Sequence, residues 1–261
     1  MNANKIHEFW NEQASLAERA GSQDLLAKEI EVQAIKRHIR NGARVCEFGC
    51  GNGVTAIALA TEYDVRIDGF DFAAAMVEAA EQAATARGLS ERLTFAVANV
   101  LDEPELDGEY DTIYTERMLI NLPDWPAQER AIRYLAGHLR PGGRLLLCEN
   151  SMQGLERLNS LRLLVGLLAI KPPWHNCYLD DTEIVALQVP ELSLIQVEPF
   201  SATYYFLSRV INAKLADDAG VPPAYDAPIN RLALQLPPFS DCAQGKLWVF
   251  ERKVLSNVGD D

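Results

Sequence analysis

The stretch RVCEFGCGNGVTAIALA, from Arg44 to Ala60, decides the fold. It places Gly49, Gly51 and Gly53 at every second position, between a short apolar run and a helix-like run. A glycine inside a regular element costs roughly 0.5–1 kcal/mol relative to alanine, so three of them need a physical reason. Either the backbone turns there with positive φ, or a ligand lies against it.

Apolar runs of strand length alternate with helical patterns on both sides of this turn. The predicted strands cover residues 43–48, 65–71, 92–99, 109–116 and 144–150, with two more at 193–200 and 246–253. The predicted helices between them include residues 24–40, for which Ser22 or Asp24 is the expected N-cap. Alternation of this kind is typical of parallel strands with helices on both faces. We therefore predict an α/β fold with a doubly wound, mostly parallel seven-stranded sheet.

The composition excludes several classes of function. The 261 residues carry a net charge of −13, which repels phosphate backbones and argues against a nucleic-acid partner. The five cysteines form no CxxC pair and the four histidines show no zinc spacing, so we predict reduced thiols and no metal. The N-terminus is polar, and the most apolar run, Leu163–Ile170, is far shorter than the roughly 20 residues of a membrane span. These features predict a cytoplasmic protein without membrane contact.

An acidic residue that follows the second predicted strand strengthens a ligand interpretation of the glycines. Ligands of doubly wound sheets bind beyond the carboxyl ends of the strands. Asp71 stands at such an end, where its carboxylate can accept hydrogen bonds from both hydroxyls of a ribose. Asp68 is a rival that falls within the strand. The GxGxG spacing differs from the GxGxxG of dinucleotide sites, so an NAD-dependent oxidoreductase is a weaker alternative.

Five motifs in order point to one family. They are VCEFGCGNG, DGFDFAAAMVEAA, FAVANV, YDTIYTERMLINLPDW and LAGHLRPGGRLLLCEN. Together they resemble the Rossmann-like (class I) S-adenosylmethionine-dependent methyltransferases, well over residues 43–150 and loosely over the last two strands. The resemblance implies S-adenosyl-L-methionine as cofactor and S-adenosyl-L-homocysteine as product. It also implies a helical cofactor lid at 1–42 and a methyltransferase domain at 43–261, with helical cap insertions at about 151–191 and 203–238.

The resemblance also implies cofactor roles for particular residues. The glycines admit the methionyl and ribose portion, Glu47 organises the turn and the ammonium group, and Asp71 binds the ribose. The other implied cofactor contacts are Phe72 and Met76 near the adenine, Asn99 and Val100 at its amino group, and Thr115 near the sulfonium. Asn99 stands where the family commonly has an acid, and its Oδ1 can still accept. The segment around Trp10, Gly21 and Ser22 is expected to fold over the cofactor.

Methyl transfer to a hydroxyl needs a base or a strongly oriented pocket, whereas a neutral amine needs little help. The catalytic candidates are Glu116, at the end of the fourth strand, and His175 and Tyr178, in the cap insertion. Glu149 is a rival base and a candidate substrate contact. An imidazole titrates near neutral pH, which suits His175 to base chemistry, although a loop histidine is also expected for structural reasons.

The predicted cap is locally basic in an acidic protein. Arg157, Arg162 and Lys171 stand in it, and Arg117 adds a cation after the fourth strand. Guanidinium groups suit carboxylates and phosphates, so we predict a small acceptor with an anionic group, from a secondary-metabolite or surface-glycan pathway. The predicted substrate contacts are Arg117, Glu149, Arg162 and Trp174. An ion pair of Arg117 with Glu116 or Glu149 is the structural alternative.

Three other functions stay open at this point. The chain could methylate RNA or protein, although its acidity and the lack of an Asn-Pro-Pro-Tyr-type motif at 115–118 argue against this. It could also bind S-adenosylmethionine for a reaction other than methyl transfer. A homodimer is compatible with the apolar helix of the cap.

Overall fold

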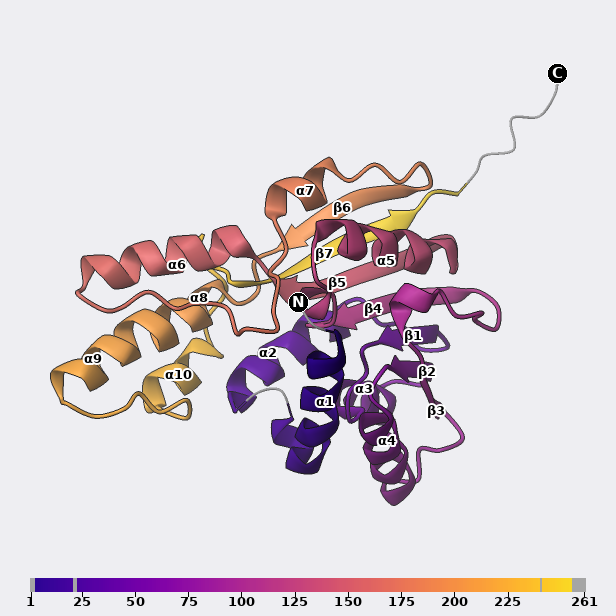
Figure 1. Cartoon of the computed structure of the whole chain (residues 1–261), viewed down its shortest axis with the longest axis horizontal. Helices are drawn as coiled ribbons and strands as arrows, with labels where there is room; N and C mark the ends of the chain where they lie inside the picture. The colour runs from indigo at the N-terminus through magenta and orange to yellow at the C-terminus, as the bar shows by residue number, and fades with distance from the viewer. Residues whose placement is uncertain (1–2, 21–22, 240, 255–261) are drawn as a thin grey trace.

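The computed structural model describes residues 3–20, 23–239 and 241–254, and one sheet organises all of them (Figure 1). Its strands lie in the order β3-β2-β1-β4-β5-β7-β6. They are β1 (Arg44–Phe48), β2 (Arg66–Asp71), β3 (Leu93–Val97), β4 (Tyr110–Glu116), β5 (Leu139–Asn150), β6 (Leu192–Glu198) and β7 (Gly245–Arg252). β7 is antiparallel to both of its neighbours, whereas β1 to β5 are parallel. The predicted seven-stranded, mostly parallel doubly wound fold is confirmed.

Helices cover both faces of the sheet. The N-terminal helices are α1 (Ala3–Gln13), η1 (Ala14–Arg19) and α2 (Leu25–Lys36). The helices between the parallel strands are α3 (Val54–Glu62), α4 (Ala74–Ala86), η2 (Val100–Asp102), η3 (Leu119–Asn121) and α5 (Trp125–Gly137). The N-cap of α2 is Asp24, whose carboxylate accepts from the Ala27 N–H; Ser22, the other candidate, lies outside the described residues.

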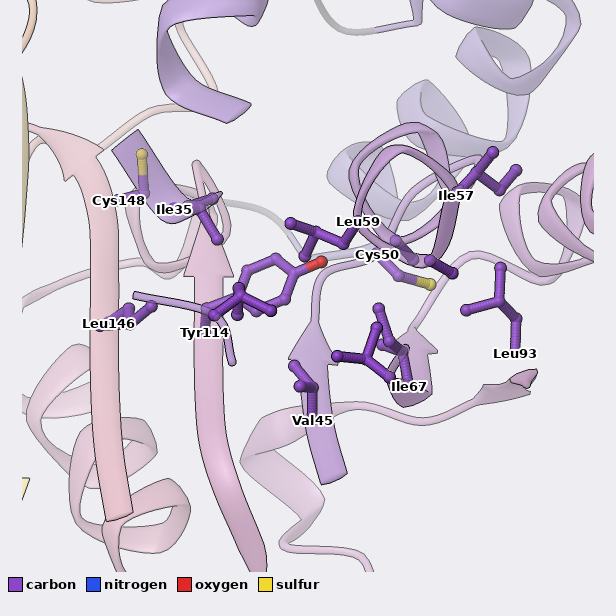
Figure 2. Close-up of a cluster of buried hydrophobic side chains, with 14 of the residues drawn as sticks. Ile35, Val45, Cys50, Ile57, Leu59, Ile67, Leu93, Tyr114, Leu146 and Cys148 are labelled. Atoms are coloured by element: carbon purple, nitrogen blue, oxygen red, sulfur yellow. The ribbon is translucent and has the colours of Figure 1, made fainter. Parts of the chain in front are cut away.

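Two apolar layers hold the sheet between its helices. On one face, α2, α3 and α4 contribute Ile35, Leu59 and Val77 to a buried cluster that also contains strand residues (Figure 2). On the other face, Ile132 of α5 and Ile184 of α7 (Asp181–Ala186) pack in a second cluster. Strands with both faces covered read as continuous apolar runs, which is why the sequence revealed them.

A helical cap stands beside the carboxyl ends of the strands. The chain leaves the sheet twice to form this cap. The first excursion carries α6 (Met152–Leu164), and the second carries α8 (Ala202–Tyr205), η4 (Phe206–Asn212), α9 (Ala213–Asp218) and α10 (Pro228–Ala233). Leu158 and Val210 bring the two excursions together in one apolar cluster, which Ala27 of α2 joins. The segment η4 is a π-helix, a form that is rare and is frequently found at functional sites.

Candidate active site

One cavity of about 1510 Å³ runs from the glycine turn to the cap. Pockets for single small ligands are commonly about 300–1,000 Å³, so this space is large enough for two. Its walls come from α1, α2, the turn after β1, the ends of β2 and β4, the 170–178 loop and the second cap excursion. The carboxyl edge of the sheet, the lid and the cap therefore enclose a single continuous site.

The glycine turn is shaped by positive φ at each glycine. The φ angles of Gly49, Gly51 and Gly53 are +80°, +51° and +74°, a region that residues with a side chain rarely adopt. At Gly49 a Cβ atom would also lie 2.5 Å from the side chain of Met118. Gly49 and Gly51 line the cavity; Gly53, predicted to do so, instead packs on Ala80 and Phe95 as the N-cap of α3.

Asp71 joins the end of β2 to the glycine turn. Its Oδ2 accepts from the Gly51 N–H at 2.9 Å and its Oδ1 from the Ala73 N–H at 2.9 Å. Burial raises the pKa of this carboxyl, although the backbone donors offset part of the effect. Each carboxylate oxygen can accept a further bond, so Asp71 can hold the turn and a ligand together.

The other predicted adenine contacts lie next to Asp71. Phe72, Met76, Asn99 and Val100 all line the cavity. The Oδ1 of Asn99 already accepts from the Leu101 N–H at 3.1 Å and caps η2, so its second lone pair remains for a ligand. These four residues, Asp71, Glu47 and the glycine turn line one end of the cavity, which we call the cofactor half because the sequence predicts the cofactor there.

Glu47 presents an unpaired carboxylate oxygen in this half. The residue is buried, and its Oε2 has no hydrogen-bond partner among the described residues. Burial, reinforced by the charge of Glu116, raises its pKa to about 8. A buried acid without a partner fits a ligand that brings a cationic group, such as the ammonium of a methionyl moiety.

Glu116 lines the cavity, and both of its carboxylate oxygens already accept a hydrogen bond from the protein. Its Oε1 accepts from Lys28 Nζ at 2.6 Å and its Oε2 from the Thr55 hydroxyl at 2.6 Å. Burial would raise its pKa, but Lys28 and Arg117 outweigh that effect and lower the pKa to about 2. A carboxylate this acidic is a weak proton acceptor at neutral pH, so its geometry favours an anchoring role over the predicted role as base.

Arg117 lies beside an acid that the sequence did not suggest as its partner. Its Nε lies 3.3 Å from Oε2 of Glu31, on α2. Arg117 follows β4 and has a φ of +52°. It is one of two non-glycine residues with positive φ in the described chain. Backbone strain of this kind is concentrated at functional sites. Arg117 and Glu31 both line the cavity.

Thr115 and Glu149, predicted to contact the cofactor and the substrate, do not line the cavity. The Thr115 hydroxyl donates to Glu149 Oε1 at 2.8 Å, and neither side chain is accessible. Glu149 also accepts from the backbone N–H groups of Met118, Leu119 and Ile120. Together they fix the loop after β4, so we assign both a structural role.

Arg162 and Trp174 are also outside the cavity lining. Arg162 donates to the carbonyls of Leu168 and Arg209 and so ties the two cap excursions together. Trp174 is 59% exposed, with its ring edge-on to Phe9 and His175. Arg157, the other predicted basic residue of α6, pairs with Asp241 at the surface. Of the basic residues predicted in the cap, Lys171 alone reaches the cavity.

His175 and Tyr178 line the cavity at the junction of lid and cap. The His175 ring lies 4.4 Å from the Phe9 ring of α1, and burial lowers its pKa, so it is neutral. Its Nδ1 is buried without a hydrogen-bond partner among the described residues. The Tyr178 hydroxyl accepts from Gln244 Nε2 at 3.1 Å, and burial raises its pKa to about 12, so it can still donate its own proton.

Several cavity residues were missed from the sequence. Arg209, on the π-helix η4, bonds Asp24, and its guanidinium lies over the rings of Tyr205 and Tyr225 at 5.0 and 4.8 Å. Lys28 and Glu31 of α2 were missed as well. Trp10 of α1, in the segment that the sequence predicts to fold over the cofactor, lines the cavity and donates to Asn121 Oδ1 at 3.3 Å. Gly21 and Ser22, expected beside it, lie outside the described residues.

Comparison with known families identifies the core of the chain. Residues 45–143 match the family described as "Methyltransferase domain". These residues form a class I S-adenosylmethionine-dependent methyltransferase domain. The match spans β1 to β5, the glycine turn, Asp71 and Glu116, and it ends before the cap begins.

Curated relatives match about half of this chain. The chain is 33% identical over 147 residues to the 27-O-demethylrifamycin SV methyltransferase of Amycolatopsis mediterranei, covering 55% of this chain and 50% of that protein. It is 32% identical over 116 residues to the demethylmenaquinone methyltransferase of Lactiplantibacillus plantarum, covering 44% and 48%. The chain thus spans about half the length of the curated relatives it matches, and these relatives are small-molecule methyltransferases by name.

Solved structures share the fold over most of the chain. The [4+2]-cyclase SpnF matches with a TM-score of 0.58 at 20% identity, covering 86% of this chain and 80% of that one. The magnesium protoporphyrin IX methyltransferase of Synechocystis PCC 6803, solved with bound S-adenosylhomocysteine, matches with a TM-score of 0.54 at 17% identity, covering 97% and 89%. At these identities the likeness describes the fold alone.

The described residues also bear on the predictions about membrane contact and metal binding. Within residues 3–20, 23–239 and 241–254, no helix combines the length and apolarity needed to cross a bilayer. The same part of the chain holds no group of three or more His, Cys, Asp or Glu side chains that could bind a metal ion.

Proposed function

We propose that this protein transfers the methyl group of S-adenosylmethionine to a small molecule held under the cap. The observation that carries this proposal is the single cavity that joins the glycine turn to the cap. Its cofactor half belongs to the methyltransferase domain, and its other half is lined by the lid and cap residues His175, Tyr178, Tyr205 and Arg209. A two-substrate reaction needs this arrangement because both reactants must meet away from water.

The residues present in the cofactor half fit S-adenosylmethionine. Asp71 would hold the ribose, the unpaired Glu47 oxygen would meet the ammonium group, and the glycine turn would admit the methionyl portion. When bound, the cofactor supplies an electrophilic methyl group and a neutral thioether as leaving group. The protein's own task is to bind and orient both partners and to exclude water from them.

The part of the cavity beside the cap is called the acceptor half below. The cations that support an anionic acceptor there are exposed residues at the mouth of the cavity. Arg117 and Arg209 are each paired with an acid, whereas Lys171 and Arg231 are exposed cations of the lining. We therefore retain an anionic group on the acceptor and place it near Lys171. Removing Lys171 should then weaken binding of an anionic acceptor and leave that of a neutral analogue unchanged. A secondary-metabolite pathway is supported by the similarity to the 27-O-demethylrifamycin SV methyltransferase.

A reaction other than methyl transfer is the second candidate. The specific observation in its favour is that the [4+2]-cyclase SpnF shares this fold over 86% of the chain. Both candidates require the cofactor half, so they differ in product alone. Formation of S-adenosylhomocysteine together with a methylated product distinguishes them.

The first test is a calorimetric titration with S-adenosylhomocysteine of the wild type and of two matched variants. Asp71→Asn should weaken binding about 10- to 100-fold, because one charged hydrogen-bond acceptor is worth roughly 1–3 kcal/mol. Asp68→Asn is the control, since Asp68 bonds Arg44, Thr94 and Tyr110 and does not line the cavity. Equal affinities for the two variants, or no binding by the wild type, would contradict the proposed cofactor site.

A further inference from the structure

Glu31 is a buried acid of the cavity wall that neither the family match nor the sequence motifs assigned. It stands on α2, outside the matched residues 45–143. The side chain is 4% exposed and lines the cavity, and its Oε2 has no hydrogen-bond partner among the described residues. Arg117 follows the end of β4, and its Nε lies 3.3 Å from the same Oε2 atom of Glu31. Glu31 is therefore a desolvated carboxyl of the cavity wall, held beside the Arg117 guanidinium, and its carboxylate oxygens keep lone pairs that can accept a proton.

The surroundings of Glu31 and Glu116 give these two carboxyls opposite properties. Glu116 receives short bonds from Lys28 and Thr55, which keep it ionised. Burial raises the pKa of Glu31 to about 8, and the charge of Glu116 adds to this effect, whereas the charges of Arg117 and Lys28 oppose it. The titratable and charged groups around Glu31 are Lys28, Glu116, Arg117, Cys148, Tyr178 and Tyr205. Two carboxyls whose surroundings separate their proton affinities commonly divide acid–base roles.

We propose that Glu31 is the base that accepts the proton of the methyl acceptor, and that the acceptor nucleophile is a hydroxyl oxygen. This inference rests on the proposed function. It replaces Glu116 and His175 as the base: the first is too acidic, and the second is held against the Phe9 ring of the lid. Arg117 is a positioning residue, because its guanidinium directs the Glu31 carboxylate from the side of β4.

The step balances without any further reactant. The acceptor oxygen forms a bond to the methyl carbon while the carbon–sulfur bond breaks, and that electron pair stays on sulfur. The hydroxyl proton moves to the Glu31 carboxylate, which later loses it to solvent. A hydroxyl needs this help and a neutral amine does not, so a base placed here points to an oxygen acceptor.

Carboxyl titration tests the role without an acceptor. We would follow the carboxylic-acid carbonyl band by infrared spectroscopy across the range from about pH 6 to pH 10 in wild type, Glu31→Gln and Glu29→Gln. Glu29 is the matched control, because it stands on the same helix, is exposed and does not line the cavity. Glu31→Gln should remove one carboxyl that titrates in this range, and Glu29→Gln should remove none. An unchanged titration in Glu31→Gln would overturn the proposal.

Matched acceptor probes test the chemistry. With 1-naphthol, Glu31→Gln should lower the rate about 100-fold and abolish its rise with pH, while 1-naphthylamine should be methylated at the wild-type rate. An equal loss of rate with both probes, or no loss of rate with either probe, would contradict a base role for Glu31. If the wild type accepts neither probe, the infrared titration decides. The affinity of Glu31→Gln for S-adenosylhomocysteine should stay within about twofold of the wild-type affinity. If the wild type itself does not bind S-adenosylhomocysteine, the proposed function is refuted instead of the role of Glu31.

Discussion

Lys28 and Glu116 are 88 residues apart in the chain, yet Lys28 Nζ lies 2.6 Å from Glu116 Oε1. The pair fastens α2 to the carboxyl end of β4, with side-chain exposures of 21% and 2%. Lys28 lies on α2, in the segment predicted to form the lid, and Glu116 ends β4, so the pair joins that segment to the sheet. The position of α2 over the cavity depends on this ion pair together with the one between Glu31 and Arg117.

Lys28→Met should reduce the free energy of unfolding by about 3 kcal/mol at neutral pH, because it leaves a buried carboxylate without its cation. The pKa of Glu116 is lowered to about 2 from an ordinary value near 4.5. Its stabilising effect is therefore complete above pH 4.5 and is lost as the pH falls towards 2. Denaturant unfolding at several pH values checks this. A difference between the two proteins that stayed constant down to pH 2 would contradict the ion-pair interpretation.

Glu47→Gln should increase the stability of the ligand-free protein at alkaline pH. The pKa of Glu47 is raised to about 8, so the folded protein binds a proton that the unfolded chain has released. This group therefore makes stability fall between about pH 4.5 and pH 8, by at most about 1.4 kcal/mol per pH unit. Thermal unfolding across that range should show a smaller decline in the variant. The variant should also bind S-adenosylhomocysteine more weakly; unchanged affinity would remove Glu47 from the site.

Gly49→Ala and Gly51→Ala should separate backbone strain from steric contact. Gly51 has nothing within 4 Å of an added Cβ, so its substitution should cost only the strain of positive φ, about 1–2 kcal/mol. At Gly49 the added atom would lie 2.5 Å from Met118, so the loss should be larger. Denaturant unfolding of both variants measures the difference. Equal losses would mean that Met118 moves away without resistance.

Phe9→Ala should loosen the lid. The Phe9 ring contacts the rings of His175, Trp10 and Trp174, and such aromatic pairs are each worth about 0.5–1.5 kcal/mol beyond burial. Limited proteolysis should cut α1 faster in the variant, and affinity for S-adenosylhomocysteine should fall about tenfold. Glu8→Ala, at an exposed position of the same helix, is the control. Equal proteolysis of both variants would argue against the lid contact.

The residues of the cofactor half could be predicted because local sequence patterns indicate them. Asp71 stands at the end of an apolar strand run, and the glycines mark a turn that needs positive φ. Both signals follow from backbone geometry within a few residues. Glu47 was singled out through the family resemblance, because it lies near the end of the strand that precedes the turn. What the sequence did not reveal is that its carboxylate is left unpaired, because that depends on what packs above it.

The acceptor half was predicted less well because it depends on packing between distant segments. Glu31 resembles an ordinary solvated residue of an amphipathic helix, and only the crossing of α2 over the end of β4 buries it. Arg162 was expected to contact substrate because it is basic, but its guanidinium is used by carbonyls of the cap. Arg209 lies on a π-helix, for which the sequence carries no local signal. The spacing of Lys28 and Glu31 on one helix face was the available clue.

The cap leaves the sheet in two separate excursions, yet α6 and η4 pack against each other as one body. Neither excursion contributes to the turn that holds the cofactor. Under the proposed function, these two stretches contribute to acceptor preference, and both lie outside the matched residues 45–143. They must be replaced as a pair, because Leu158 and Val210 share one apolar cluster. A chimera that takes a single excursion from a relative should have a mismatched interface, whereas one that takes both should keep the contact between them.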